Sequence, residues 1–134
     1  LYQAMDDHPD AKAIVLTSCT YDGLCYDLAP IIAKAHAKGI KVIIDEAWFG
    51  HARFHPAFRP TALECGADYA TQSTHKVLSA FSQASMIHVN DPDFDEHAFR
   101  ENFNMHASTS PQYALIASLD ESTLLSSGTS CDDA

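Results

Sequence analysis

Basic side chains are scarce in this chain. Lysine and arginine together supply only eight of the 134 residues, against 18 aspartates and glutamates, so the formal net charge at pH 7 is −10. Nucleic-acid binding depends on clustered Lys and Arg that neutralise phosphates, and here the basic residues form no run or stripe. We therefore expect no nucleic-acid partner for this chain.

The sequence also lacks the patterns of membrane and secreted proteins. It contains no apolar run of about twenty residues that could span a membrane, and no signal peptide is recognisable. Its four cysteines, at positions 19, 25, 65 and 131, show no CxxC spacing and no nucleophilic context. These absences predict a cytoplasmic protein without a membrane partner, in which Cys19 and Cys25 fill core space.

A metal site is not expected either. His51 and His55 are four residues apart, a spacing that would place both on one face of a helix. However, no Glu follows His51 in the HExxH manner, and Pro56 argues against a continuing helix. We therefore expect no zinc here. His88, within an apolar stretch, is expected to be a hydrogen-bonded core or strand-end residue.

What the chain does contain is a series of apolar strands that alternate with helices. Strands are predicted at residues 13–17, 41–45, 68–73 and 84–89, and helices at residues 27–38, 61–66 and 95–102. Gly39 is well suited to end the helix over residues 27–38. The alternation predicts an α/β fold with a mainly parallel sheet.

The two ends of the sequence differ from this pattern. Residues 1–5 read as the end of a helix and no methionine begins the chain, which suggests a piece of a longer protein. A last helix opens at Ser110-Pro111, and its expected buried residues are Tyr113, Leu115, Ile116 and Leu119. Residues 121–134, ESTLLSSGTSCDDA, are rich in Ser, Thr and Asp and are predicted to be a disordered tail. One domain over residues 1–120 is therefore expected.

Polar clusters follow three of the predicted strands, at residues 17–20, 45–48 and 73–76. In parallel α/β sheets, ligands bind outside the carboxyl ends of the strands, where the loops converge. The three clusters therefore predict one binding site.

Lys76 is the residue in this region that most needs an explanation. It lies in ATQSTHKVLSAFSQASM, a run of hydroxyls and apolar residues without an acidic neighbour. It could be a surface lysine whose stem covers apolar neighbours. It could bind phosphate, although the GxxxxGK[ST] pattern of a P-loop is absent. It could also form a Schiff base, which requires a partly desolvated amine.

Asp45 favours the third interpretation. A hydrophobic strand that delivers a carboxylate into a cleft is what a pyridoxal cofactor requires, because the carboxylate keeps the pyridine nitrogen protonated. Two alternatives remain open from the residues alone. The string VIIDE also resembles a Walker B strand that holds Mg²⁺, and a strand-end carboxylate can simply meet a helix N-terminus.

Several blocks, in order along the chain, resemble the bacterial Orn/Lys/Arg decarboxylase family. They are TYDGLCYD from Thr20, DEAWFGHARFHP from Asp45, STHK from Ser73, AFSQASMIHV from Ala80 and HASTSPQY from His106. That family belongs to the aspartate-aminotransferase-like, fold type I group of pyridoxal-phosphate enzymes. The resemblance implies that residues 1–120 form part of a large cofactor-binding domain, with a mainly parallel sheet in three layers.

The resemblance also implies roles for particular residues. Lys76 would bind pyridoxal 5′-phosphate covalently, and Asp45 would pair with the pyridine nitrogen. The remaining implied cofactor contacts are Ala47 under the ring, Ser73 and His75 at the phosphate, Thr20 at the phenolic oxygen, and Trp48 lining the site. Trp48 could equally be a core aromatic. Ser108 and Thr109 would serve the phosphate of a neighbouring subunit, because the family's site lies at a dimer interface.

The implied activity is decarboxylation of a basic amino acid, lysine, ornithine or arginine, in a homodimer or higher homo-oligomer. The family's upstream phosphate loop and its ring-stacking histidine cannot be placed in the twelve residues before the first predicted strand. The implied site is therefore incomplete in this chain. The alternative function is that of a catalytically inactive remnant or interaction module of such an enzyme.

Overall fold

The computed structural model describes residues 1–108 and 110–128. Its helices and strands, in chain order, are α1 (Tyr2–Asp7), β1 (Ala13–Thr17), α2 (Leu28–Ala37), β2 (Lys41–Asp45), β3 (Tyr69–Gln72), α3 (Thr74–Val77), β4 (Met86–Val89), α4 (Glu96–His106) and α5 (Tyr113–Gly128). Two short 3-10 helices, Ala52–Phe54 and Pro56–Phe58, lie between β2 and β3. The predicted α/β class is confirmed.

The four strands form one sheet in the order β1-β2-β3-β4. The first three strands are parallel and β4 runs antiparallel to β3, so the prediction of a mainly parallel sheet is also confirmed. Val15 pairs with Ile43 and Ile43 with Tyr69, so their side chains share one face. The alternate residues, such as Val42 and Ile44, point to the other face and are fully buried.

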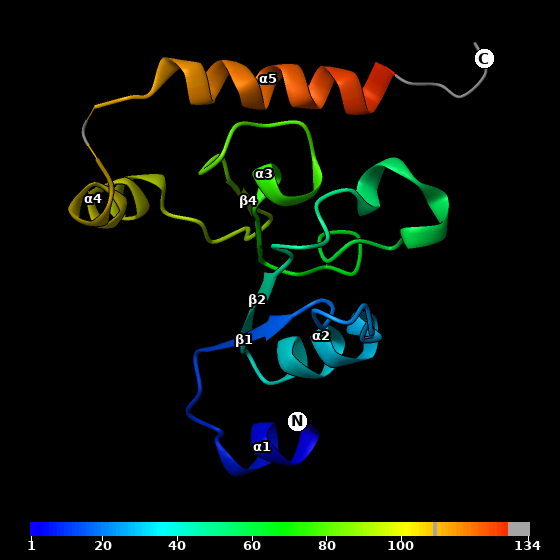
Figure 1. Cartoon of the computed structure of the whole chain (residues 1–134). Helices are drawn as coiled ribbons and strands as arrows, with labels where there is room; N and C mark the ends of the chain where they lie inside the picture. Colours follow the sequence, from blue (N-terminus) through cyan, green and yellow to red (C-terminus); the bar gives the residue numbers. More distant parts are fainter. Residues whose placement is uncertain (109, 129–134) are drawn as a thin grey trace.

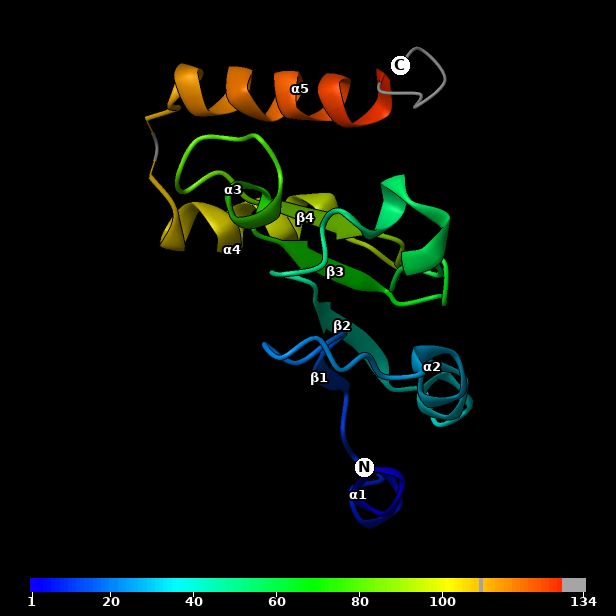
Figure 2. The ribbon, with the colours of Figure 1, turned by 45° about the vertical axis from the view of Figure 1, so that its right-hand side comes forward.

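Helix α2 covers that buried face, whereas α4 lies on the opposite side of the sheet (Figures 1 and 2). Ile32 and Ala35 of α2 pack in one apolar cluster with the buried strand residues Val42, Ile44 and Ala70. Burying an aliphatic side chain of this size contributes about 1.5–3 kcal/mol, so this cluster is a main source of stability. Asp27 precedes α2 and Gly39 follows it with φ of +72°, as the helix-stop prediction requires.

The opposite face of the sheet is more open. Val15 retains 67% and Ile87 45% of their accessible surface. Phe94 and Phe99 reach this face from the α4 side, with the Phe94 ring 6.4 Å from that of Tyr69. Within the described residues, no helix is long and apolar enough to cross a membrane.

The segment over residues 61–66 differs from its prediction as a helix. It forms successive turns, closed by bonds such as Cys65 N to Thr61 O (3.0 Å), and it ends at Gly66 with φ of +93°. Glu64 also accepts a hydrogen bond from the Thr61 backbone N–H, and the Glu64 N–H donates to the Thr61 hydroxyl, so side chains close the first of these turns.

The predicted disordered tail is wrong over residues 121–128, because α5 continues to Gly128 (Figure 1). Hydroxyl groups in this part donate to carbonyls four residues earlier, for example Thr123 to Leu119 O (2.9 Å) and Ser126 to Ser122 O (2.8 Å). The Ser- and Thr-rich composition is therefore accommodated within the helix. Residues 129–134 of the predicted tail lie outside the described residues.

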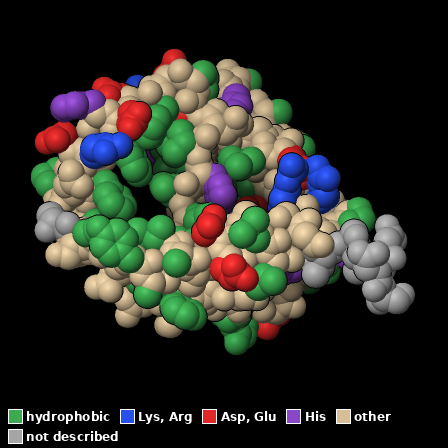
Figure 3. Space-filling view, turned by 90° about the horizontal axis from the view of Figure 1, so that it is seen from above, with side chains coloured by type: hydrophobic (Ala, Val, Ile, Leu, Met, Phe, Trp, Pro, Cys, Tyr) green, Lys and Arg blue, Asp and Glu red, His purple; other side chains and the backbone are tan. Residues whose placement is uncertain are grey.

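The predicted buried side of α5 is wrong at two of its four residues. Tyr113 and Ile116 are exposed, whereas Leu115 and Leu119 are partly buried, and hydrophobic side chains on this face of the molecule are visible in Figure 3. The buried residues are Ser118 and Ser122. Ser118 Oγ accepts a hydrogen bond of 3.1 Å from the Phe81 backbone N–H, so small side chains let α5 approach the loop after α3.

Charged residues at the amino ends of β2 and β3 form an ion-pair cluster. Lys41 donates to Asp91 and, over 3.0 Å, to Asp93. Asp91 also accepts from the Tyr69 hydroxyl at 2.7 Å. The bonds from Lys41 and Tyr69 lower the pKa of Asp91 to about 2, and the Asp91 carboxylate raises the pKa of Tyr69 to about 12. Close by, buried Asp68 accepts from the Val42 amide N–H over 2.7 Å.

Candidate active site

The carboxyl ends of β1, β2 and β3 lie side by side. Thr17 pairs with Asp45, and Asp45 pairs with Thr71, so the polar segments that follow these strands start from one edge of the sheet. The sequence predicted this convergence, and the register confirms it.

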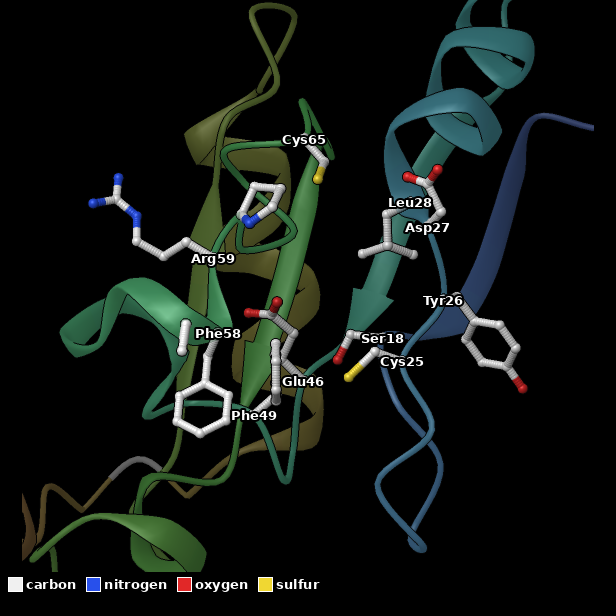
Figure 4. A pocket seen from close by; sticks show the side chains of 12 residues that line it. Ser18, Cys25, Tyr26, Asp27, Leu28, Glu46, Phe49, Phe58, Arg59 and Cys65 are labelled. Atoms are coloured by element: carbon white, nitrogen blue, oxygen red, sulfur yellow. The ribbon is translucent and has the colours of Figure 1, made fainter.

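Two successive carboxylates at the end of β2 occupy different environments. Glu46 is 1% exposed, whereas Asp45 is partly accessible. Glu46 accepts 2.8 Å hydrogen bonds from the Ala62 backbone N–H and from Gln72 Nε2. Gln72 Oε1 in turn accepts from His88 Nε2 at 2.9 Å, which confirms His88 as a hydrogen-bonded strand residue. Glu46 is thus structural, and its carboxylate points toward the segment that carries Arg59 (Figure 4).

Asp45 keeps part of its carboxylate available. Its Oδ1 accepts a 2.8 Å hydrogen bond from the Ala47 backbone N–H, which fixes the side chain at the strand end. Within the described residues, Oδ2 accepts no hydrogen bond. A half-buried, oriented carboxylate with one open oxygen can bind a protonated nitrogen of a ligand.

Lys76 also lacks an acidic partner within the described residues. It lies on α3, directly after β3, and its Nζ sits 5.2 Å from the ring centroid of Trp48. Three other lysines, Lys34, Lys38 and Lys41, form ion pairs with aspartates. The amine of Lys76 is instead placed over an aromatic ring that follows Asp45 by three residues.

Trp48 belongs to this site and not to the core. It is 45% exposed, and the ring of Tyr21 meets it edge-on at 5.3 Å. The core alternative for Trp48 is therefore wrong. Thr20, beside Tyr21, accepts a hydrogen bond from the Leu24 backbone N–H through its own hydroxyl (3.1 Å), and its implied contact with the cofactor stays a prediction.

Ser73 and His75 flank the start of α3. Ser73 precedes the helix, and its carbonyl accepts from Lys76 N at 2.9 Å. Its hydroxyl has no partner among the described residues. His75 Nδ1 donates to the Ala84 carbonyl at 2.8 Å. With Nδ1 so engaged, the Nε2 of His75 can donate to a phosphate only when the ring carries a second proton. Their phosphate roles stay predictions.

A cavity of about 260 Å³ opens on the Glu46 side of this edge (Figure 4). Residues that line it include Ser18, Cys25, Glu46, Phe58, Arg59 and Cys65, but neither Asp45 nor Lys76. Sequence reasoning did not single out Glu46 as the residue that anchors this edge. The signal that could have found it is strand alternation, because the residue after Asp45 must turn toward the face of Ile44.

The remaining candidates lie elsewhere. The ring of Phe58 contacts His51 edge-on, with the centroids 5.1 Å apart, and His55 at a tilt, with the centroids 5.4 Å apart. Among the described residues, no group of three or more His, Cys, Asp or Glu could hold a metal ion. Ser108 is exposed and accepts from Ser110 N at 3.1 Å, and its implied partner-subunit role stays a prediction. Thr109 lies outside the described residues.

Comparison with known sequences identifies the family. The profile of the Orn/Lys/Arg decarboxylase major domain matches residues 1–132. This chain belongs to the Orn/Lys/Arg decarboxylase family. It is 44% identical over 131 residues to the lysine decarboxylase LdcA of Pseudomonas aeruginosa, covering 90% of this chain and 17% of LdcA.

Other relatives include enzymes for two different amino acids. The chain is 42% identical to a lysine decarboxylase of Hafnia alvei, over 85% of its own length and 16% of the relative. It is 38% identical to the biodegradative arginine decarboxylase of Escherichia coli, over 87% of its length and 17% of the relative. The chain thus spans about one sixth of these relatives.

Solved structures confirm the fold type. A cystathione gamma lyase of Micromonospora echinospora superposes with a TM-score of 0.72 at 19% identity, covering 94% of this chain and 32% of that one. Mouse CSAD in apo form superposes with a TM-score of 0.60 at 22% identity, covering 69% of this chain and 21% of that one. The sheet and its helices therefore correspond to part of the large domain of fold type I pyridoxal-phosphate enzymes.

Proposed function

We propose that this chain supplies the lysine and carboxylate of a pyridoxal-phosphate site that decarboxylates a basic amino acid. The observation that carries the proposal is the pair of unsatisfied groups at one sheet edge. The open Oδ2 of Asp45 and the amine of Lys76 are complementary to the pyridine nitrogen and the aldehyde of that cofactor. When bound, pyridoxal phosphate serves as an electron sink for the bond that breaks at the substrate Cα.

Each residue has a task that follows from its surroundings. Asp45, oriented by the Ala47 N–H, would hold the proton on the ring nitrogen. Lys76 would supply the amine that reacts with the cofactor aldehyde. Trp48 lies beneath this amine and would shield it from water on one side. Ser73 and a doubly protonated His75 would hold the phosphate by hydrogen bonds.

The substrate class and the assembly are part of the proposal. Relatives that act on lysine and on arginine are both similar to this chain, which supports a basic amino acid and leaves lysine, arginine and ornithine to be tested. We propose a homodimer or higher homo-oligomer, in which Ser108 and Thr109 contact the cofactor phosphate of a neighbouring subunit.

Borohydride trapping tests the proposal directly. The purified chain is incubated with pyridoxal phosphate, reduced and mapped by peptide mass spectrometry. We expect the reduced adduct on Lys76 in preference to the other four lysines. Lys12 is the matched control, because it is also exposed and forms no ion pair among the described residues. Lys76→Ala should abolish the specific adduct and Lys12→Ala should leave it intact.

Equal labelling of all lysines would contradict the proposed site. Carbon dioxide release from lysine, ornithine and arginine then separates the proposed activity from its alternative. Release that depends on Lys76 supports a decarboxylase, whereas specific trapping on Lys76 without release supports a binding-competent but inactive module.

A further inference from the structure

The segment between β1 and α2 folds back on itself and brings two thiols together. Cys19 and Cys25 face each other in an antiparallel bridge. Two backbone hydrogen bonds flank this bridge: Thr20 N to Leu24 O (2.8 Å) and Tyr26 N to Ser18 O (3.1 Å). Gly23, with φ of +87°, permits the tight turn between the two arms. We call residues 18–26 the thiol hairpin.

The hydrogen-bond pattern determines how close the two cysteines are. Because the bonds lie on either side of the bridge, Cys19 and Cys25 form a non-hydrogen-bonded pair, whose Cα atoms are typically about 4.5 Å apart with both side chains on one face. Disulfides require Cα separations of about 4.4–6.8 Å. The backbone of the hairpin therefore already meets the main geometric condition for a bond between these residues.

The two thiols differ in accessibility. Both are free in the structure, with Cys25 exposed and Cys19 partly buried. Burial raises the pKa of the Cys19 thiol, and Cys25 adds to this shift electrostatically because it is close by. These positions overturn the expectation that both cysteines fill the core. They also make Cys25 the thiol that an external reagent reaches first.

We propose that Cys19 and Cys25 are a redox-responsive pair that closes to an intramolecular disulfide in the presence of a low-molecular-weight disulfide such as oxidised glutathione. The Cys25 thiolate attacks one sulfur of oxidised glutathione and releases one glutathione thiolate. The Cys19 thiolate then attacks the Cys25 sulfur and releases the second glutathione. Two protein thiols are oxidised, one glutathione disulfide is reduced to two glutathiones, and the two protons pass to the leaving thiolates.

The thiol hairpin is connected to the proposed active site through Tyr21. This residue lies in the turn of the hairpin, and its ring meets Trp48 at 5.3 Å, while Trp48 lies under Nζ of Lys76. Closing the disulfide would restrict the arms that hold Tyr21 against Trp48. Because Trp48 is the only tryptophan of the chain, its fluorescence reports on this contact without any cofactor.

Peptide mapping tests the proposal on the 134-residue chain. The chain is equilibrated with mixtures of oxidised and reduced glutathione, quenched with an alkylating agent and digested with trypsin. Cleavage after Lys12 and Lys34 leaves Cys19 and Cys25 together in peptide 13–34, whereas Cys65 falls in another peptide. We expect peptide 13–34 to lose two hydrogens and to resist alkylation, while Cys65 stays alkylated.

Three controls keep the result specific to the fold. Cys25→Ser should abolish the disulfide and the accompanying change in Trp48 fluorescence, and Cys65→Ser should alter neither. In urea, closure should require at least about tenfold more oxidised glutathione relative to reduced, because the unfolded chain does not hold the two thiols together. Independent alkylation of Cys19 and Cys25 under all ratios, a Cys25–Cys65 disulfide, or equal closure in urea would each overturn the proposal.

Discussion

The charged side chains at the two ends of the parallel strands differ in whether they have partners. At the amino ends, Lys41 is held by Asp91 and Asp93, and Asp68 accepts from a buried amide. At the carboxyl ends, Asp45 keeps an open oxygen and Lys76 has no acidic partner within the described residues. Satisfied groups stabilise the folded chain, whereas unsatisfied ones are available to a ligand. The charged groups that stabilise the fold thus lie at the amino ends of the strands, and those available to a ligand lie at the carboxyl ends.

Glu46 also lies at the carboxyl end but is buried and fully hydrogen-bonded. Its substitution is expected to reduce the free energy of unfolding more than any other change considered. Glu46→Ala removes the acceptor of the Ala62 N–H and of the Gln72 amide in a buried position, so we expect the free energy of unfolding to fall by about 3 kcal/mol. Urea denaturation measures this. The neighbouring Asp45→Ala should cost about 1 kcal/mol, since it removes one partly accessible bond. Equal costs would contradict the division between the two carboxylates.

Substitution of Asp68 tests whether a buried carboxylate at the amino ends of the strands stabilises the fold. Asp68→Ala leaves the fully buried Val42 N–H without its acceptor, and we expect a loss of about 2 kcal/mol in the free energy of unfolding. Asp6 is the matched control, because its carboxylate pairs with Lys34 and Lys38 at an exposed position. If Asp6→Ala destabilises the chain as much as Asp68→Ala, burial is not what makes the amino end stabilising.

Because of the ion-pair cluster around Lys41, the free energy of unfolding should decrease at acidic pH. The folded-state pKa of Asp91 is about 2, below its usual 3.8, so its contribution is complete above about pH 4 and is lost as the pH falls toward 2. The urea midpoint should therefore decrease through this range. Asp91→Asn should flatten that decrease. A decrease of the same size in Asp91→Asn would assign the acid sensitivity elsewhere.

The smallest effect is expected for the lysine of the proposed site. Lys76→Met removes an exposed amine whose contact, within the described residues, is with the Trp48 ring, so the free energy of unfolding should change by about 0.5 kcal/mol. Trp48 fluorescence should nevertheless change, because the cation over its ring is gone. Lys41→Met, at the other end of the sheet, should destabilise the chain more. The reverse order would show that Lys76 is primarily structural.

Much of the fold could be predicted because strands and α2 follow from local patterns. The periodicity of residues 27–38 and the position of Gly39 located α2 to within a residue at each end. The face of α5 could not be predicted, because close approach to the Phe81 backbone favours serine over the larger apolar residues. The Ser- and Thr-rich composition of residues 121–128 led to a wrong prediction of disorder, because hydroxyl groups there donate to backbone carbonyls of the same helix.

The candidate site was predictable in its location but not in its detail. Strand-end reasoning brought Asp45 and the Lys76 segment to one edge. It did not assign Glu46 to the buried side, although strand alternation carries that signal. It could not place Trp48 beneath the Lys76 amine, because that contact depends on packing between separate segments. The pairing of Cys19 with Cys25 was also missed, since it depends on a hairpin of backbone hydrogen bonds that the spacing alone does not specify.

The central claim is that Asp45 and Lys76 bind opposite ends of one pyridine ring. It is tested most directly by comparing the dissociation constants of pyridoxal phosphate and of its analogue with CH in place of the ring nitrogen. We expect the wild-type chain to favour pyridoxal phosphate by at least about tenfold, the equivalent of one charge-assisted hydrogen bond, and Asp45→Asn to lose that preference. Equal binding of the two compounds by the wild-type chain would contradict the claim.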